Sequence, residues 1–344
     1  MGGAVPMPTL QLPSRASAAP PDSSLAPKHD MRWLDALKGL AIALIVLNHI
    51  AERTWGAPLA GNKFTAPLSQ RISQWAPMPN AFATVVRDIG WTGDQGVTLF
   101  VLLSGLGLAY GLARRRTPSY FALGAYFRAR GRRIYPLWWA AHLALLAAMF
   151  LLHRRIDTAR FVLSFVGIRG SYFPAWWFFG LIVQCYLAFP LLWWFARRFG
   201  AMKMTLVFVG LGVASRAAGV FLFGHVGSYC VVFYPEFAVG VGAGIVFADH
   251  HNFAIAMRTS LRPALLCVVS LAAGFALSFT LHGMIVAPLL MGTSVFVLGY
   301  ILLAKVKESH VLVGIGAHSY VIFLAFDPVL TLVYRAAHVL APLR

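Results

Sequence analysis

The feature that most constrains this chain is a succession of apolar stretches, most about 20 residues long, separated by short polar segments. A helix needs about 20 apolar residues to cross the roughly 30 Å of hydrocarbon in a bilayer. Only helices and closed barrels satisfy all their backbone hydrogen bonds within lipid. The sequence therefore predicts an all-α fold, a polytopic transmembrane helical bundle of about nine to ten spans. Nine clear spans are expected at residues 32–52, 96–113, 134–152, 175–196, 204–223, 229–248, 263–281, 283–304 and 311–334.

A tenth crossing depends on residues 158–169, which contain the apolar run FVLSFVGI. This run is too short for a simple span, so a re-entrant or tilted, sheltered segment is the alternative to a crossing. Residues 53–90 form a long polar connection after the first span, and connections of this length are often functional.

Composition agrees with a membrane protein, because 59% of the 344 residues are hydrophobic. The net charge of +18 does not indicate a nucleic-acid partner, since the basic residues gather in short clusters between apolar runs. Such clusters are typical of cytoplasmic loops, and with nine spans all four would fall on the N-terminal side. They lie at residues 114–133, 197–203, 249–262 and 305–308.

Two regions follow from the same patterns. Residues 1–30 are rich in proline, alanine and serine and are expected to form a disordered tail without the pattern of a signal peptide. Residues 31–344 are expected to form the transmembrane domain, with the N-terminus in the cytoplasm.

The first span carries ionisable residues on one helical face. Asp35, Lys38, His49 and Glu52 follow one another at helical spacings, in line with two isoleucines. Each ionisable group costs roughly 2.5–3.5 kcal/mol at mid-membrane, so such groups normally face protein or a wet cavity. From Lys38 to His49 the stripe covers roughly 16 Å at about 1.5 Å per residue. Ordinary juxtamembrane charge is the alternative, and it is the favoured interpretation of Arg32 taken alone.

His49 is the candidate general base, because an imidazole exchanges protons near neutral pH. Glu52, one turn further on, is expected to orient the ring and stabilise an imidazolium. Acyl transfer from a thioester to an alcohol needs such a base and an oxyanion donor, and it needs no metal. The Ser104-Gly105 pair does not match a nucleophile elbow, so direct transfer is simpler than a serine acyl-enzyme.

Further charges are candidates for binding. Arg130 and Arg133 are expected to hold the phosphates of coenzyme A, with anchoring by the positive-inside rule as the alternative. Arg216 and Glu236 lie inside two spans and are either substrate-binding residues or partners in a structural ion pair. Asp94 is a weaker candidate for an acid on the acceptor side.

Several motifs together resemble the integral-membrane acyltransferase-3 family of sugar O-acyltransferases. The family's opening pattern is matched by Arg32, by LDALKG at residues 34–39 and by His49, and its second-span pattern by GVTLF and Ser104-Gly105. Arg130 to Pro136, the tryptophan-rich fourth span and the GAHSY segment near the end match further elements. The chain departs from the family pattern at Gln184, often an acid, and at Phe326, often a histidine.

The resemblance implies a transmembrane acyltransferase domain over residues 31–344 that uses cytoplasmic acyl-CoA, usually acetyl-CoA, as co-substrate. The implied acceptor is a hydroxyl of a cell-surface or exported glycan or of a lipid-linked sugar. His49 would be catalytic, and the expected donor site comprises Arg32, Lys38, Arg130 and Arg133. The expected location is the bacterial inner membrane, with no tightly bound cofactor. A small-molecule O-acyltransferase and a glycan or lipid transporter are the alternatives, although the chain lacks the paired halves of many transporters.

Overall fold

The computed structural model describes residues 32–56, 68–118, 121–151, 153, 155–168, 172–226, 230–250, 260–305 and 310–340. The residues from Arg32 onward form one compact unit, Arg32–Arg344. The expected disordered tail at residues 1–30 lies outside the described residues, as do parts of the polar connections at 53–90, 249–262 and 305–308. Within the described ranges every regular element is a helix.

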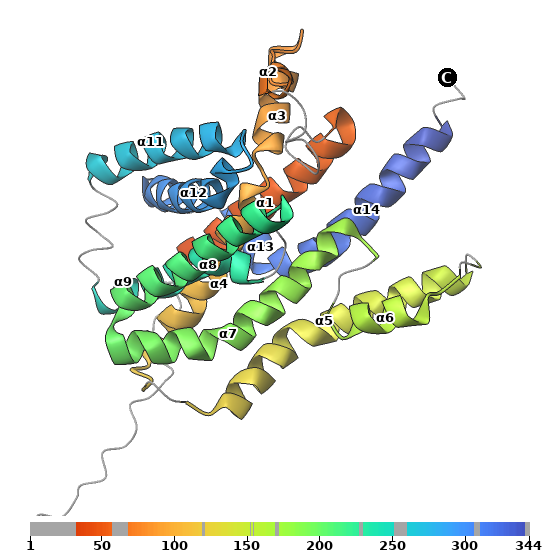
Figure 1. Ribbon diagram of the computed structural model, residues 1–344. Coiled ribbons are helices and arrows are strands. Elements are labelled where there is room, and N and C mark those ends of the chain that lie inside the picture. The colour runs from red at the N-terminus through yellow and green to blue at the C-terminus, as the bar shows by residue number, and fades with distance from the viewer. Residues whose placement is uncertain are drawn as a thin grey trace, which may run out of the picture. The chain divides into compact units, whose positions relative to one another are not determined.

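Figure 1 shows the order and packing of these helices. Eight of them, α1, α4, α5, α7, α8, α9, α11 and α14, are long and apolar enough to cross a membrane, and α12 is a shorter apolar helix. The predicted all-α polytopic bundle is therefore confirmed. The elements are α1 (Arg32–Trp55), α2 (Leu68–Ser73), α3 (Ala81–Trp91), α4 (Gln95–Arg114), α5 (Leu123–Leu151), α6 (Thr158–Phe165), η3 (Pro174–Trp176), α7 (Trp177–Phe199), α8 (Ala201–Phe223), η4 (Cys230–Phe233), α9 (Tyr234–Asp249), α11 (Leu261–Ser278), η5 (Gly283–Ile285), α12 (Ala287–Lys305), α13 (His310–Ala317) and α14 (Ser319–Leu340).

The segment that left a tenth crossing open forms the short helix α6, which lies beside α5 (Figure 1). Eight residues are too few to cross a bilayer. The indole Nε1 of Trp138 donates a hydrogen bond to the carbonyl of Ser164 at 3.1 Å, and His142 Nε2 lies 2.8 Å from Ser164 Oγ. Protein thus covers one side of the short apolar run, whereas Val162, Leu163, Val166 and Ile168 on it are exposed.

Helix α5 begins much earlier than the predicted third span. The expected basic loop at 114–133 is wrong in its second half, because α5 starts at Leu123 and carries Arg130 and Arg133 on its first turns. Arginine and alanine are good helix formers, so the helix continues beyond the apolar run that marks the span. The donor-site arginines consequently project from a helix, with fixed relative positions.

The polar connections meet at one end of the bundle. The ring of Trp33, at the start of α1, lies 5.9 Å from that of Phe247 near the end of α9 and 5.1 Å from that of Tyr300 near the end of α12. At the end of α7, Trp193 Nε1 donates to the carbonyl of Pro118 in the α4–α5 connection at 2.8 Å. These contacts agree with the common side that the basic clusters predict.

Helices α4 and α9 form the closest pair in the bundle because glycines lie at their contact. A side chain at Gly105 would come within 2.5 Å of the Phe237 carbonyl oxygen, and one at Gly240 would collide with the backbone of Leu102. Small residues let helix backbones approach closely in lipid, where packing drives association. This pair fixes the centre of the bundle, against which α1 also packs.

The expected final span is interrupted, which corrects the single helix predicted over 311–334. It consists of α13 and α14, with the break at His318. Gly316 of α13 lies directly against the backbone of Asp35 in α1, leaving no room for a Cβ atom. The chain therefore bends where two helices cross at backbone distance, a constraint that hydropathy does not register.

The final span runs in the same direction as α1 (Figure 1). At the start of both, Arg32 Nη2 lies 3.1 Å from His310 Nδ1, and at their ends Thr54 Oγ1 lies 2.6 Å from the Tyr334 hydroxyl. Two parallel terminal spans require an odd number of crossings. Within the part of the chain that the structure describes, the eight long helices together with α12 make nine.

The expected polar connection at 53–90 needs correction as well. Helix α1 continues to Trp55, and the described part of the connection contains α2 and α3. Asn48 Nδ2 donates to the carbonyl of Gly90 at 3.1 Å, which holds α3 against α1. Trp91 Nε1 donates to the carbonyl of Gly56 at 2.8 Å.

Candidate active site

The site is built from the second half of α1, where His49 is half-buried. Its Nδ1 atom lies 3.0 Å from the carbonyl oxygen of Ile45, one turn earlier. The edge of the ring meets the ring of Phe326 on α14, with centroids 5.0 Å apart and planes at 78°. In the tautomer that donates from Nδ1 to this carbonyl, Nε2 keeps its lone pair free for a proton. The arrangement can therefore hold a neutral imidazole in one orientation.

Glu52 does not orient His49 as expected. Glu52 is half-buried, and none of the hydrogen bonds and ion pairs found among the described residues involves it. Side chains on a helix lean toward its N-terminus, so the His49 ring leans toward Ile45 and away from Glu52. The Ile45 carbonyl consequently takes the position assigned to the carboxylate.

A half-buried ion pair that the sequence analysis did not predict lies one turn beyond His49. Arg53 Nη2 donates to Asp327 Oδ1 and, at 3.1 Å, to Thr331 Oγ1. The backbone N–H of Ala175 donates to the other carboxylate oxygen of Asp327 at 3.0 Å. Asp327 is completely buried and joins α1, α14 and η3. The available signal was an acid followed by Pro328 within an apolar span, since intramembrane acids are functional candidates.

The middle of the ionisable stripe faces protein. Ile42 and Ile45 are buried in the same hydrophobic cluster as Phe178, Phe323 and Phe326. The ring of Phe178 contacts that of Phe323 at 5.5 Å between centroids. The polar ends of the stripe are thus linked by an apolar region between α1, α7 and α14.

The basic end of the stripe contains an ion pair within α1. Lys38 Nζ lies 3.0 Å from Asp35 Oδ1, with both side chains partly exposed. Arg32 lies next to α13 through its contact with His310. These cations stand at the end of α1 opposite His49, as their positions in the sequence require.

The two arginines of α5 border a group of tyrosines. The guanidinium carbon of Arg130 lies 5.9 Å from the Tyr126 ring centroid, whereas Arg133 is exposed. The Tyr126 hydroxyl donates to the carbonyl of Tyr186 on α7 at 3.0 Å. Both guanidinium groups also interact electrostatically with Tyr186. These tyrosines were not predicted, because their proximity requires α5 and α7 to pack.

Arg216 and Glu236 form an ion pair with each other, which was the alternative to substrate binding in the sequence analysis. Arg216 Nη2 lies 2.9 Å and 2.8 Å from the two carboxylate oxygens of Glu236, and both side chains are almost completely buried. Arg216 Nη1 also donates to the Ile285 carbonyl at 3.4 Å. The pair joins α8, α9 and η5, and its mutual bonding argues against the expected substrate-binding role.

Asp94 lies at the start of α4, at the same end of α1 as His49. It is half-buried and accepts a hydrogen bond from Gln95 Nε2 at 3.1 Å. The neighbouring Gly93 lies against the Leu44 carbonyl of α1. The structure thus brings Asp94 to the half of α1 that carries His49.

Among the described residues, the eight long apolar helices and the shorter α12 define a multi-pass integral membrane protein. A family model described as an acyltransferase domain matches residues 31–341. The chain therefore belongs to the acyltransferase-3 family and is a membrane acyltransferase. No curated protein and no solved structure matches it.

Proposed function

We propose that this membrane acyltransferase moves an acyl group, most simply acetyl, from cytoplasmic acyl-CoA to a hydroxyl of an exported glycan or lipid-linked sugar. His49 acts as the general base. The observation that carries the proposal is the constrained ring of His49, whose Nδ1 faces the Ile45 carbonyl while Phe326 packs against its edge. We also propose the bacterial inner membrane as the location, with the arginine-rich end in the cytoplasm.

The proposed reaction needs one general base and one thioester. His49 Nε2 takes the proton of the acceptor hydroxyl as its oxygen attacks the thioester carbonyl carbon. The tetrahedral intermediate collapses with cleavage of the carbon–sulfur bond. The sulfur of coenzyme A leaves as a thiolate and recovers the proton from the imidazolium, so the products are an ester and free coenzyme A.

The donor occupies the basic end in this proposal. Arg130 and Arg133 hold phosphates of coenzyme A, because guanidinium groups bind phosphate oxygens through paired hydrogen bonds. Lys38 and Arg32 contribute positive charge from α1. The thioester arm extends from this end toward His49, a distance of roughly 16 Å at about 1.5 Å per residue of α1.

The acceptor occupies the opposite end. Glu52 stabilises the imidazolium through the electrostatic field of a nearby carboxylate, without a direct hydrogen bond. Asp94 serves as a polar contact for the acceptor, since it stands at the start of α4 beside the same half of α1.

The test is transfer or hydrolysis of radiolabelled acetyl-CoA by purified protein in detergent. Replacing His49 by alanine should lower the rate by about 10²–10⁴-fold, the usual contribution of a positioned general base. The matched control is His318→Ala, because His318 Nδ1 makes the same contact with a carbonyl one turn earlier, Gly314 at 2.9 Å. The control should retain the rate of the unaltered protein.

Full activity of His49→Ala would refute the proposed mechanism. Equal losses in both variants would assign a structural role to the two histidines. Comparison of acetyl-CoA with longer acyl-CoA esters under the same conditions tests the acyl group, and failure of every acyl-CoA would reject the donor.

A further inference from the structure

Helix α3 presents its apolar side outward. Phe82, Val85 and Ile89 are exposed, with Phe82 78% accessible, and they follow helical spacing along one face. The opposite face carries Arg87, which is only 5% accessible. In water this arrangement would expose apolar area at a cost of about 25 cal/mol per Å² while removing a charge from solvent. It is the arrangement of a helix whose surroundings are hydrocarbon.

The buried guanidinium group of Arg87 on α3 contacts polar and aromatic groups of neighbouring residues. Arg87 Nε donates to Asp88 Oδ1 at 2.8 Å, and Nη2 donates to the carbonyl of Ala76 at 3.1 Å. The guanidinium carbon lies 4.7 Å from the ring centroid of Trp91. These contacts hold the guanidinium on the protein-facing side of α3, away from the exposed apolar face.

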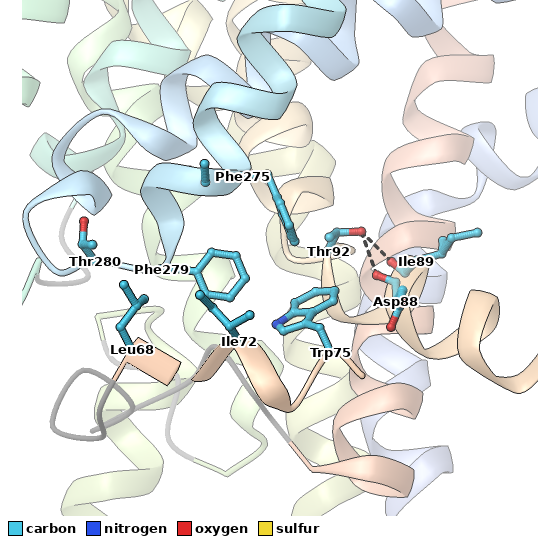
Figure 2. A pocket seen from close by; sticks show the side chains of 10 residues that line it. Leu68, Ile72, Trp75, Asp88, Ile89, Thr92, Phe275, Phe279 and Thr280 are labelled. Carbon is cyan, nitrogen blue, oxygen red and sulfur yellow. Dashed lines mark hydrogen bonds between the residues drawn. The ribbon is translucent and has the colours of Figure 1, made fainter. Parts of the chain in front are cut away.

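An apolar groove lies between the α2–α3 segment and α11. Its volume is about 740 Å³, within the roughly 300–1,000 Å³ typical of small-molecule sites. Figure 2 shows Leu68, Ile72 and Trp75 on one side, and Phe275 and Phe279 on the other. The ring of Trp75 meets that of Phe275 edge-on, with centroids 5.1 Å apart. The walls of the groove are therefore mainly aromatic and aliphatic, and the one charged residue on them, Asp88, is paired with Arg87.

The hydroxyl groups along the groove are already hydrogen-bonded to the backbone. Thr92 Oγ1 donates to the carbonyl of Asp88 at 3.1 Å, and Thr280 Oγ1 donates to that of Leu277 at 3.1 Å (Figure 2 shows the Thr92 bond). A sugar or a peptide backbone would lose its own hydrogen bonds on these walls. The groove suits a ligand that consists of hydrocarbon.

The indole Nε1 of Trp75 is enclosed and has no hydrogen-bond partner within the described part of the chain. In Figure 2 this nitrogen is turned toward Ile72, another residue that lines the groove. An indole N–H offers a single donor. Because protein atoms cover this nitrogen, the indole presents only its ring to the groove.

The groove is continuous with a surface that already faces lipid. Its α11 wall belongs to a membrane-crossing helix on which Leu265, Leu266 and Val269 are exposed. Exposed apolar residues on such a helix contact acyl chains. On the other wall, Leu68 and Ile72 of α2 and the outward face of α3 extend the apolar surface, while the serines and the glutamine of α2 face away from the hydrocarbon side chains.

We propose that the groove between α2, α3 and α11 binds the acyl chain of a membrane phospholipid, with the outward apolar face of α3 (Phe82, Val85 and Ile89) against the bilayer. The site lies beside the half of α1 that carries His49, because Asn48 and Trp91 bond the two elements together. This inference stands independently of the acyl donor and of the acceptor.

The test uses the photo-crosslinking residue p-benzoylphenylalanine in place of Ile72. The protein is purified from membranes, washed with excess detergent, illuminated and weighed by intact-protein mass spectrometry. An adduct with the mass of a phospholipid is expected. The matched control carries the same probe in place of Phe221, an exposed residue of α8, where freely exchanging lipid should be removed by the wash.

Two further variants test whether the adduct forms inside the groove. With the probe at Ile72, Ala276→Trp fills the groove and should remove most of the adduct, whereas Leu266→Trp on the lipid-facing side of α11 should leave it. Absence of a lipid adduct at position 72, in membranes as well as after washing, would overturn the proposal. Crosslinking to a second copy of the chain, or equal adducts at positions 72 and 221 after washing, would also overturn it.

Discussion

At the scale of single residues, the environment of His49 depends on contacts between residues far apart in the sequence. Phe326 packs against the histidine ring, and the next residue, Asp327, receives Arg53 from the following turn of α1. The aromatic ring limits the motion of the base, and the ion pair fixes the helix that carries it. Phe326, at which this chain departs from the family pattern, thus contacts His49, the proposed catalytic residue.

Removing the buried carboxylate should destabilise the protein strongly. Asp327→Ala leaves Arg53 and the N–H of Ala175 without their acceptor, and breaking a buried ion pair costs about 3–5 kcal/mol. The measurement is thermal unfolding in detergent, followed by the fraction that remains monodisperse.

Asp35→Ala is the matched control, because its pair with Lys38 is partly exposed. Pairs of that kind contribute about 0–1 kcal/mol. Equal thermal stability of the two variants would show that the Asp327 contacts contribute no more than a surface pair.

At the scale of elements, α5 holds part of a basic cluster in fixed positions and so forms a candidate binding surface. Arg130 and Arg133 lie one turn apart, next to Tyr126 and to Tyr186 of α7. Arg132 is also exposed, but the helical repeat turns it to a different side of α5. This difference separates phosphate binding from general positive charge.

Arg133→Gln should raise the KM for acetyl-CoA by roughly 10–100-fold, since a hydrogen bond to a charged group contributes about 1.5–3 kcal/mol. The kcat should change little, because a phosphate contact far from the thioester stabilises ground state and transition state alike. Steady-state kinetics on the purified enzyme measure both constants.

Arg132→Gln, which removes the same charge, should leave the KM close to that of the unaltered protein. If the two variants raise the KM equally, the arginines act through their combined charge and form no specific phosphate site.

At the scale of the whole described bundle, the parallel course of α1 and α14 sets the topology. Helix α1 begins where Arg32 meets His310 of α13, the helix that leads into α14, and α1 ends where Thr54 meets Tyr334 of α14. With the basic connections in the cytoplasm, α14 must end on the outer side. His49 then lies in the outer half of the membrane, away from the proposed cytoplasmic donor.

Reporter fusions test this topology. Alkaline phosphatase, which is active only outside the cytoplasm, should be active when fused after Leu340. It should be inactive when fused after Gly200, because α1, α4, α5 and α7 make four crossings before that point. Activity of both fusions, or of neither, would contradict the five crossings that α8, α9, α11, α12 and α14 make between the two fusion points.

The sequence by itself determined the helical class, the approximate spans, the common side of the basic clusters and the family. Each of these depends on local properties: the length of an apolar run, the position of arginines beside it, and short motifs. Because the prediction used only local properties, it was wrong at two places. Helix α5 includes charged residues that were predicted to form a loop, and the last span breaks between α13 and α14, where α13 crosses α1 at backbone distance. Hydropathy measures transfer into lipid and does not register either effect.

Only the tertiary structure decided which charged residues meet. Arg216 pairs with Glu236, and Arg53 with Asp327, because the rotation and tilt of packed helices bring their side chains together. The same packing turned His49 toward Ile45 and Phe326, leaving Glu52 apart. It also placed the apolar face of α3 outward, beside the groove. Helical periodicity fixes the side of a helix on which a residue lies, but its partner depends on the neighbouring helix.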